Sequence, residues 1–318
     1  MLRREQTVDS VASLELGDVV TQFLNEYRHG SRKTLEHYEY HVGRCLVPYL
    51  QERDVRTLLD ITPAILRDWL VQQTTRVSGT TLGGRYDAAS RFFNWAVDQE
   101  YIEFSPMRKV RRPKTVTPTR LAFTRDEIAA LLREAGKAGG WLGYRDRALI
   151  LFLVSTGARA NEALSLTSSS FEWASRRKPD ATVSASRSVR VLLHGKGGKD
   201  RWVPVGAKAA EAVKQYIIHR PANTTDNLWV TAQHTAMDHG ALWGMMKNLG
   251  RYAGVEHVHP HRFRHTYTCE WWPMNKDIVA IKNLLGHSKL QTTELYLRSL
   301  GVEYGTGDEY RTPDEWLA

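Results

Sequence analysis

Two arginines and a tyrosine lie in three separate stretches that could together perform chemistry on a phosphodiester. Arg159 lies in T-G-A-R-A-N-E, Arg264 lies in H-P-H-R-F-R-H-T, and Tyr296 ends L-L-G-H-S-K-L-Q-T-T-E-L-Y. A phosphodiester is negatively charged and a poor electrophile, so cutting it without a metal requires fixed cations around one nucleophile. Arginine suits that task because its planar guanidinium grips two phosphate oxygens and stays protonated.

Neighbouring residues could assist these three. Glu162 lies one helical turn after Arg159, where its carboxylate could brace a charged side chain. His261 opens an H-x-x-R pattern, and it is the candidate to accept the proton that a phenol with a pKa near 10 must lose as it attacks. His287 follows a glycine that is typical of a helix end, which would turn the imidazole towards a phosphate oxygen.

Taken singly, each of these residues has an ordinary structural explanation. Arg159 and Glu162 could form a plain ion pair, His287 could be a satisfied core histidine, and Tyr296 is one of 13 tyrosines. Their occurrence together favours the chemical interpretation. In this order, across about residues 121 to 300, the boxes resemble those of the tyrosine recombinase (phage integrase) family.

The resemblance implies a site-specific DNA recombinase that cuts and rejoins duplex DNA through a 3′-phosphotyrosyl intermediate, without ATP, metal or cofactor. It implies a catalytic set with Glu162 in support: Arg159, Lys196, His261, Arg264, His287 and Tyr296. Lys196 would be the general acid on a mobile hairpin, and Lys199 is its rival, because the sequence does not place the turn to one residue. Family members commonly carry an acidic residue where Arg262 stands.

The elements that must position these residues can be predicted from local patterns. Residues 145–164 form a buried helix that breaks at Gly157 and restarts, and this glycine would allow a close backbone approach to a ligand. Two β-prone runs over 188–205 flank a glycine-rich turn and predict a hairpin. Thr124 and Glu127 form a capping box that starts a helix at Arg125.

The N-terminal part shows only helical patterns. We expect helices over 16–28, from Ser31 to about Leu50, over 63–73 and over 80–100. The run R-F-F-N-W-A-V-D-Q-E-Y-I resembles the SAM-like core-binding domain of the same family. The expected fold is mainly α, with a small antiparallel β-sheet in an α+β catalytic domain, and the two domains would form a C-shaped clamp around DNA.

Composition supports a DNA-binding protein of two domains. The chain of 318 residues is 42% hydrophobic and carries a formal charge of +9, which favours a polyanionic partner. We expect a helical domain over 1–107, a basic linker over 108–120, a catalytic domain over 121–300, and an acidic tail over 301–318 that docks onto a neighbouring protomer. The candidate DNA contacts are basic: Arg32, Lys33, Arg85, Arg91, Arg108, Lys109, Arg111, Arg112 and Lys114.

Other functions fit the sequence less well. His257, His259, His261 and His265 could suggest a metal site, but there is no H-E-x-x-H pattern, and G-K-G-G-K is no phosphate loop because no Ser or Thr follows Lys199. A monomeric type IB topoisomerase, a DNA-binding protein that has lost catalysis and a metallohydrolase remain as rivals.

The resemblance also indicates the setting in which the protein works. Its partners would be duplex DNA with paired inverted core sites, three further copies in a tetramer formed on DNA from free monomers, and an accessory DNA-bending or directionality factor. Two distant cysteines and the lack of a secretory or membrane-spanning apolar run favour a cytoplasmic, nucleoid-associated protein of a bacterium, phage or mobile element.

Overall fold

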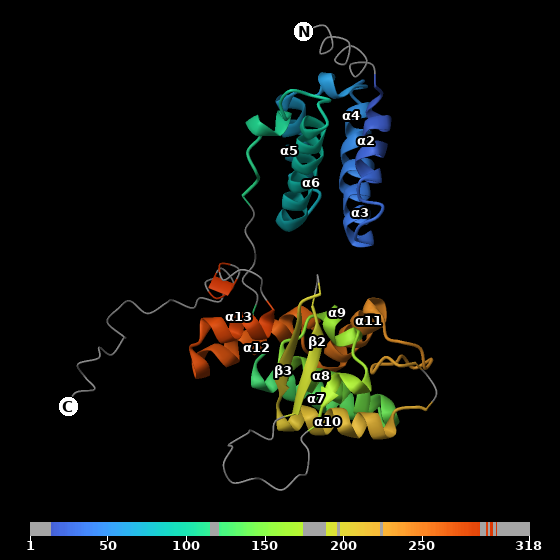
Figure 1. Ribbon diagram of the computed structural model, residues 1–318, viewed down its shortest axis with the longest axis vertical. Helices are drawn as coiled ribbons and strands as arrows, with labels where there is room; N and C mark the ends of the chain where they lie inside the picture. The colour runs from blue at the N-terminus through green and yellow to red at the C-terminus, as the bar shows by residue number, and fades with distance from the viewer. Residues whose placement is uncertain are drawn as a thin grey trace, which may run out of the picture. The chain divides into compact units, whose positions relative to one another are not determined.

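The computed structural model describes residues 14–114, 121–173, 189–195, 198–222, 225–286, 291, 293, 294 and 297. The chain divides into two compact units, Met1–Pro118 and Thr119–Ala318, each of which is described by itself. Helices dominate both units, and the described strands form one small antiparallel sheet (Figure 1). The expected fold class, mainly α with a small β-sheet, is therefore confirmed. No helix in the described part of the chain combines the length and apolar character needed to cross a membrane.

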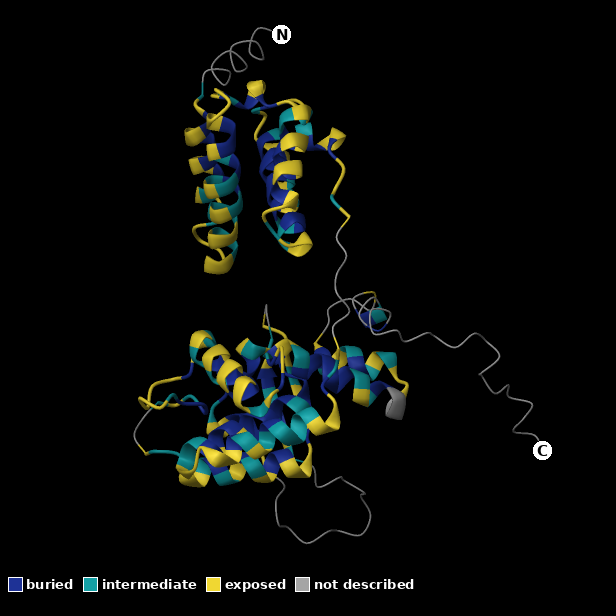
Figure 2. Cartoon of the chain, turned by 180° about the vertical axis from the view of Figure 1, so that it is seen from behind, coloured by how far each residue is buried: buried dark blue, intermediate teal, exposed yellow. Residues whose placement is uncertain are grey.

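The first unit is a helical bundle. Its elements are α2 (Leu16–Asn25), α3 (Arg32–Tyr38), the π-helix η1 (Glu39–Leu46), α4 (Val47–Gln51), η2 (Leu58–Asp60), α5 (Pro63–Thr74), α6 (Gly79–Asp98) and η3 (Pro106–Lys109). Buried and exposed residues lie on different sides of these helices (Figure 2). The core is aromatic: the Phe23 ring packs edge-on, 5.3 Å from the Phe92 ring, and the fully buried Trp69 belongs to the same cluster.

The basic segment after α6 begins as part of this first unit. Val110 is 4% exposed, and its carbonyl accepts a hydrogen bond from the Tyr86 hydroxyl at 3.0 Å. Arg112 forms a two-pronged ion pair with Asp87 on α6 at 2.9 and 3.0 Å. The segment expected to be an extended linker from residue 108 is thus bonded to α6 of the bundle as far as Arg112. Residues 115–120 lie outside the described residues.

The second unit surrounds the buried helix α8. Its elements are α7 (Arg125–Lys137), α8 (Gly140–Thr156), α9 (Ala160–Leu164), η4 (Ser168–Ser170), β1 (Phe171–Glu172), β2 (Val189–His194), β3 (Asp200–Val205), α10 (Ala207–His219), α11 (His239–Ala253), α12 (Pro260–Asn275) and α13 (Ile278–Leu285). Helices α7, α10 and α12 and strand β3 all pack against α8 (Figure 1). The sheet order is β1-β2-β3, with Phe171 opposite Val191 and Val191 opposite Val203.

Two glycines end the helices that border the site. Gly157 terminates α8 with φ +59°, and Gly286 terminates α13 with φ +66°, a left-handed conformation that costs other residues energy. A Cβ atom on Gly157 would lie 2.6 Å from the ring of Tyr267. The Tyr267 side chain of α12 therefore packs so closely on Gly157 that a side chain there would clash.

Candidate active site

Three arginines donate hydrogen bonds to successive carbonyls at the C-terminal end of α13. Arg201 Nε lies 2.7 Å from the Leu284 oxygen, and Arg264 Nη2 lies 2.7 Å from the Leu285 oxygen. Arg159 Nη2 lies 3.3 Å from the Gly286 oxygen. The last carbonyls of a helix have no partner within it and carry partial negative charge, so these guanidinium groups satisfy them. Residues from β3, α12 and the start of α9 are thereby joined at one turn.

One buried carboxylate links two of these arginines. Glu162 Oε1 accepts hydrogen bonds from Arg159 Nη1 and Arg201 Nη1, each at 2.8 Å. Its Oε2 accepts from the Arg159 backbone N–H at 2.8 Å and from Arg201 Nη2 at 2.9 Å. Burial by itself would raise the pKa of the Glu162 carboxyl, but the hydrogen bonds from Arg201 and Arg159 and the charge of Arg201 outweigh it and lower the pKa to about 2. Glu162 is therefore ionised at neutral pH.

The two candidate phosphate-binding arginines differ in exposure. Arg264 is 4% exposed and is held by the carbonyls of Gly157, at 3.0 Å, and Leu285. The Arg159 side chain is 42% exposed. Two guanidinium groups on one carboxylate, with a third bonded to the neighbouring end of α13, leave an excess of positive charge, which suits an anionic ligand. Arg264 is thus a fixed group, whereas Arg159 presents part of its guanidinium to solvent.

A cavity of about 240 Å³ brings His261 together with both arginines. Arg159, His261 and Arg264 line it, with Trp243 and His259 among the other residues of its wall. Pro260 begins α12, and the His259 side chain caps that helix by accepting the Arg262 N–H at 3.2 Å. His261 therefore lies on the first turn of α12, at the cavity and one turn before Arg264.

The described residues bring together Arg159, Glu162, His261 and Arg264 of the expected set. Lys196, His287 and Tyr296 lie outside the described residues, although parts of their surroundings are described. Lys199 is an exposed residue of the hairpin, and its carbonyl accepts the Gly195 N–H at 3.1 Å. Leu297, which follows Tyr296 in the sequence, is fully buried in a cluster with Leu285 and Tyr267.

Arg201 and Trp243 also belong to the site, and neither was predicted from the sequence. Arg201 lies two residues before Val203 on β3, and strand alternation puts it on the same face as that buried valine. A charged residue at an inward position requires a partner, which is the signal that could have revealed it. Trp243 on α11 is 52% exposed at the cavity, and its ring stacks on His259 with centroids 5.9 Å apart. Its exposure is a property of the fold, so no pattern in the sequence marks it.

Arg262 supports the start of α12. Its Nη2 atom lies 2.8 Å from Glu127 Oε2, and its Nη1 atom donates to the Glu256 carbonyl at 2.6 Å. Its guanidinium also lies 3.9 Å from the centre of the Phe123 ring. Glu127 meanwhile closes the expected capping box of α7 with Thr124. Arg262 therefore ties the H-x-x-R box to the first turn of α7.

The candidate DNA contacts of the first unit are mostly at the surface. Arg32 pairs with Glu36 at 2.8 Å and is almost fully exposed. The remaining surface positions are also exposed in the structure: Lys33, Arg91, Arg108, Lys109, Arg111, Arg112 and Lys114. Arg85 corrects our expectation: it is 6% exposed, and its guanidinium donates to the Gln73 side chain inside the bundle. Its side chain is thus enclosed in the first unit, whereas the other candidate contacts lie at the surface.

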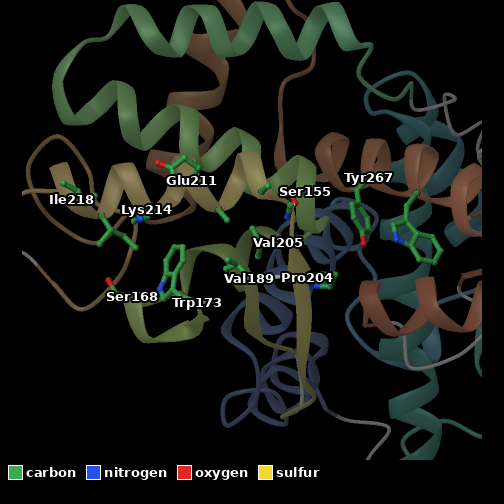
Figure 3. A pocket seen from close by; sticks show the side chains of 15 residues that line it. Ser155, Ser168, Trp173, Val189, Pro204, Val205, Glu211, Lys214, Ile218 and Tyr267 are labelled. Atoms are coloured by element: carbon green, nitrogen blue, oxygen red, sulfur yellow. The ribbon is translucent and has the colours of Figure 1, made fainter. Parts of the chain in front are cut away.

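A larger cavity of the second unit lies elsewhere. It measures about 1020 Å³ and lies between the sheet, α10 and α12, with Trp173, Pro204, Ile218 and Tyr267 in its wall (Figure 3). Of the candidate catalytic residues that the structure describes, none lines it. Among the described residues, no group of three or more His, Cys, Asp or Glu side chains could hold a metal ion, so the four histidines at 257–265 do not form such a group.

Comparison with known proteins finds relatives over most of the chain. The model of the phage integrase family matches residues 122–301. Tyrosine recombinase XerC of Actinobacillus pleuropneumoniae is 26% identical over 279 residues, covering 86% of each chain. Tyrosine recombinase XerD of Ralstonia nicotianae is 29% identical over 277 residues, covering 84% of this chain and 83% of its own.

Solved structures support the same fold. The XerH site-specific recombinase bound to a palindromic difH substrate superposes with a TM-score of 0.68 at 21% identity, covering 88% of this chain and 80% of XerH. The Tn1549 transposon integrase in complex with transposon right-end DNA gives 0.72 at 16% identity, covering 96% of this chain and 99% of its own.

Proposed function

Because this chain belongs to the phage integrase family and is a tyrosine-type site-specific DNA recombinase, we propose that it cuts and rejoins duplex DNA through a 3′-phosphotyrosyl bond to Tyr296. The observation that carries this proposal is the convergence of Arg159, Arg264 and His261 on one cavity beside the turn at Gly286. That arrangement supplies cations and a proton-handling group within reach of one phosphate.

The proposed cleavage begins with attack by the Tyr296 hydroxyl oxygen on the scissile phosphorus. The phenol loses its proton to His261 as the new P–O bond forms. The bond from phosphorus to the 5′ oxygen breaks on the opposite side, and that oxygen takes a proton from Lys196 or, alternatively, Lys199. The phosphotyrosyl bond keeps the energy of the phosphodiester, so attack by a 5′ hydroxyl reseals the strand without ATP.

The two arginines would act mainly on the transition state. Attack crowds five oxygens around phosphorus and spreads extra negative charge over those that do not react, so fixed cations favour this state over the ground state. Arg264 suits the role because two backbone carbonyls already hold its guanidinium in place. His287 directly follows Gly286, whose carbonyl Arg159 contacts, which supports its proposed role as a donor to the same phosphate.

Packing near Tyr296 supports its action in the protomer that carries it. The next residue, Leu297, is buried with Leu285, and the Leu285 carbonyl accepts the hydrogen bond from Arg264. Leu297 and Arg264 thus both interact with the region of Leu285 within a single chain. We propose that Tyr296 is delivered in cis to the phosphate bound by Arg159 and Arg264.

We assign the remaining parts of the chain to DNA binding and assembly. Residues 1–107 would bind the core site opposite the catalytic domain over 121–300, residues 108–120 would follow the phosphate backbone, and residues 301–318 would dock onto a neighbouring protomer. Exchange of two duplexes requires four cleavages, and hence four protomers. The abundance of exposed arginine and lysine at 108–114 supports the contact with phosphates.

A nicked suicide substrate tests this function. The protein is incubated in EDTA with a library of nicked duplexes, and covalent complexes are separated on a denaturing gel. We expect a shifted band with the wild-type protein and none with Tyr296→Phe, whereas the control Tyr252→Phe, at an exposed tyrosine, keeps the band. Binding without any band would favour a protein that has lost catalysis. A band with plasmid relaxation but no strand exchange would favour a topoisomerase.

A further inference from the structure

Arg201 bridges three parts of the candidate site although it does not line the cavity. Its side chain, 12% exposed, donates two hydrogen bonds to Glu162 and one to the carbonyl of Leu284. These bonds connect β3 with the start of α9 and with the end of α13. The strand also follows directly on the hairpin turn that carries Lys199.

Arg201 and Arg159 share the charge of Glu162 unequally. Arg201 holds both carboxylate oxygens with the two nitrogens of its fork, at 2.8 and 2.9 Å. The Arg159 side chain reaches only one oxygen, Oε1, at 2.8 Å, and its exposed fraction is 42% against 12% for Arg201. Arg201 therefore provides most of the charge and hydrogen bonding that offset the desolvation of the buried Glu162 carboxylate.

Loss of Arg201 would change the state of Arg159. Glu162 is 3% exposed, so solvent compensates poorly for the lost arginine, and Arg159 would be the remaining cation bonded to it among the described residues. The Arg159 guanidinium would then bind both carboxylate oxygens of Glu162, and fewer of its N–H donors would face the cavity. The turn at Gly286 would also lose a contact, because the Arg201 guanidinium packs against this glycine. A Cβ atom built on Gly286 would lie only 2.8 Å from Arg201 Nη1.

We propose that Arg201 is a positioning residue for DNA cleavage: it neutralises Glu162, so that Arg159 keeps its charge and donors for the scissile phosphate, and it fixes the turn before His287. This inference rests on the proposed function, because it assumes that Arg159 binds the phosphate. It assigns Arg201 no contact with DNA and predicts that its effect passes through Glu162.

A charge-based double-mutant cycle tests this proposal. Single-turnover formation of the covalent complex is measured on a duplex selected by the wild-type protein, together with DNA affinity and the melting temperature. We expect Arg201→Ala to slow cleavage by about 10²-fold, as for a lost charge-stabilising donor, with little change in DNA affinity. Adding Glu162→Gln to Arg201→Ala should restore the rate by about tenfold, because a neutral amide no longer captures Arg159.

Two further variants guard against a simple folding defect. Arg201→Lys keeps the charge that neutralises Glu162, so it should be faster than Arg201→Ala even where both melt at the same temperature. Arg190→Ala, on the neighbouring strand, removes an exposed ion pair with Glu172 at 2.8 Å and should leave the rate unchanged.

The outcomes separate the two proposals. A wild-type protein that forms no tyrosyl adduct overturns the proposed function, and this inference with it. If the wild-type protein forms the adduct and Arg201→Ala forms it equally fast, only the inference about Arg201 is wrong. An Arg201→Ala defect that Glu162→Gln leaves unchanged or deepens would also overturn it, since Arg201 would then act only as a structural support.

Discussion

The guanidinium of Arg264 lies 2.7 Å from the carbonyl oxygen of Leu285, the last residue of α13. The side chain of the same leucine is fully buried in one cluster with Leu297, one residue beyond Tyr296. One residue therefore anchors both a candidate phosphate-binding arginine and the segment next to the candidate nucleophile. Any movement of the α13 end would shift the two groups together.

Truncation of the two arginines should separate catalysis from stability. Arg264→Ala leaves two buried carbonyls without a donor and should lower the free energy of unfolding by about 2 to 5 kcal/mol. Arg159→Ala should change stability much less, because its side chain is 42% exposed. Both variants should slow single-turnover cleavage by about 10²-fold or more. Thermal melting and adduct formation measure the two effects, and equal destabilisation by both variants would contradict the different roles.

Glu162 should make stability depend on pH in the acidic range. Its folded pKa of about 2 lies below the usual value of 4.5, so its contribution to stability is complete above pH 4.5 and is lost as the pH falls towards 2. The contribution at neutral pH is about 3 kcal/mol. The melting temperature of Glu162→Gln should therefore fall furthest below that of the wild type at neutral pH, and the difference should shrink below pH 4.5. A difference that stays constant from pH 7 to pH 3 would rule out this linkage.

Arg262 should contribute to stability through Glu127. Removal of the arginine breaks a mostly buried ion pair and a contact with Phe123, so we expect Arg262→Ala to cost about 1 to 3 kcal/mol. Glu127→Gln should be destabilising as well, and the double variant should lose less than the sum of the two. Chemical denaturation of the four proteins gives the coupling. Strict additivity would show that Arg262 and Glu127 do not act as a pair.

Trp243 should matter for DNA and little for folding. Its indole is 52% exposed beside the cavity that contains Arg159 and His261. An aromatic face so placed can pack on a nucleotide next to the bound phosphate, and such contacts are worth about 1 to 3 kcal/mol. We expect Trp243→Ala to weaken DNA binding about tenfold without lowering the melting temperature. The control is Trp202→Ala, an exposed tryptophan of β3; equal losses from both would refute a specific contact at Trp243.

Much of the fold could be predicted from local patterns. The helix expected over 63–73 is α5 (Pro63–Thr74), where Thr62 caps the first turn, and the hairpin expected over 188–205 is β2 and β3. The helix expected to continue to residue 28 ends at Asn25 instead. The one expected from Ser31 to Leu50 contains the π-helix η1, which directly precedes α4 with Pro48 in its first turn. Helical periodicity does not reveal such a change of winding.

The burial of Arg85 could have been predicted from its place on the helix. It follows Leu82 by three positions and precedes Ala89 by four, so helical spacing already placed it on the buried face of α6.

The contacts of the candidate site were predicted less completely than its residues. The bonds of Arg201 and Arg159 to the end of α13 join residues 83 and 127 positions apart. Such contacts depend on how helices pack in three dimensions, and no local pattern encodes them.

The most direct test of the account is to identify the amino acid that is bonded to DNA. The wild-type protein is trapped in EDTA on the nicked duplex that it selects, the complex is digested, and the peptide that carries a nucleotide is sequenced by tandem mass spectrometry. We predict a 3′-phosphotyrosyl bond at Tyr296 that forms about 10²-fold or more slowly in Arg264→Ala at equal DNA occupancy. A bond to any other residue, or an adduct that forms as fast without Arg264, would contradict it.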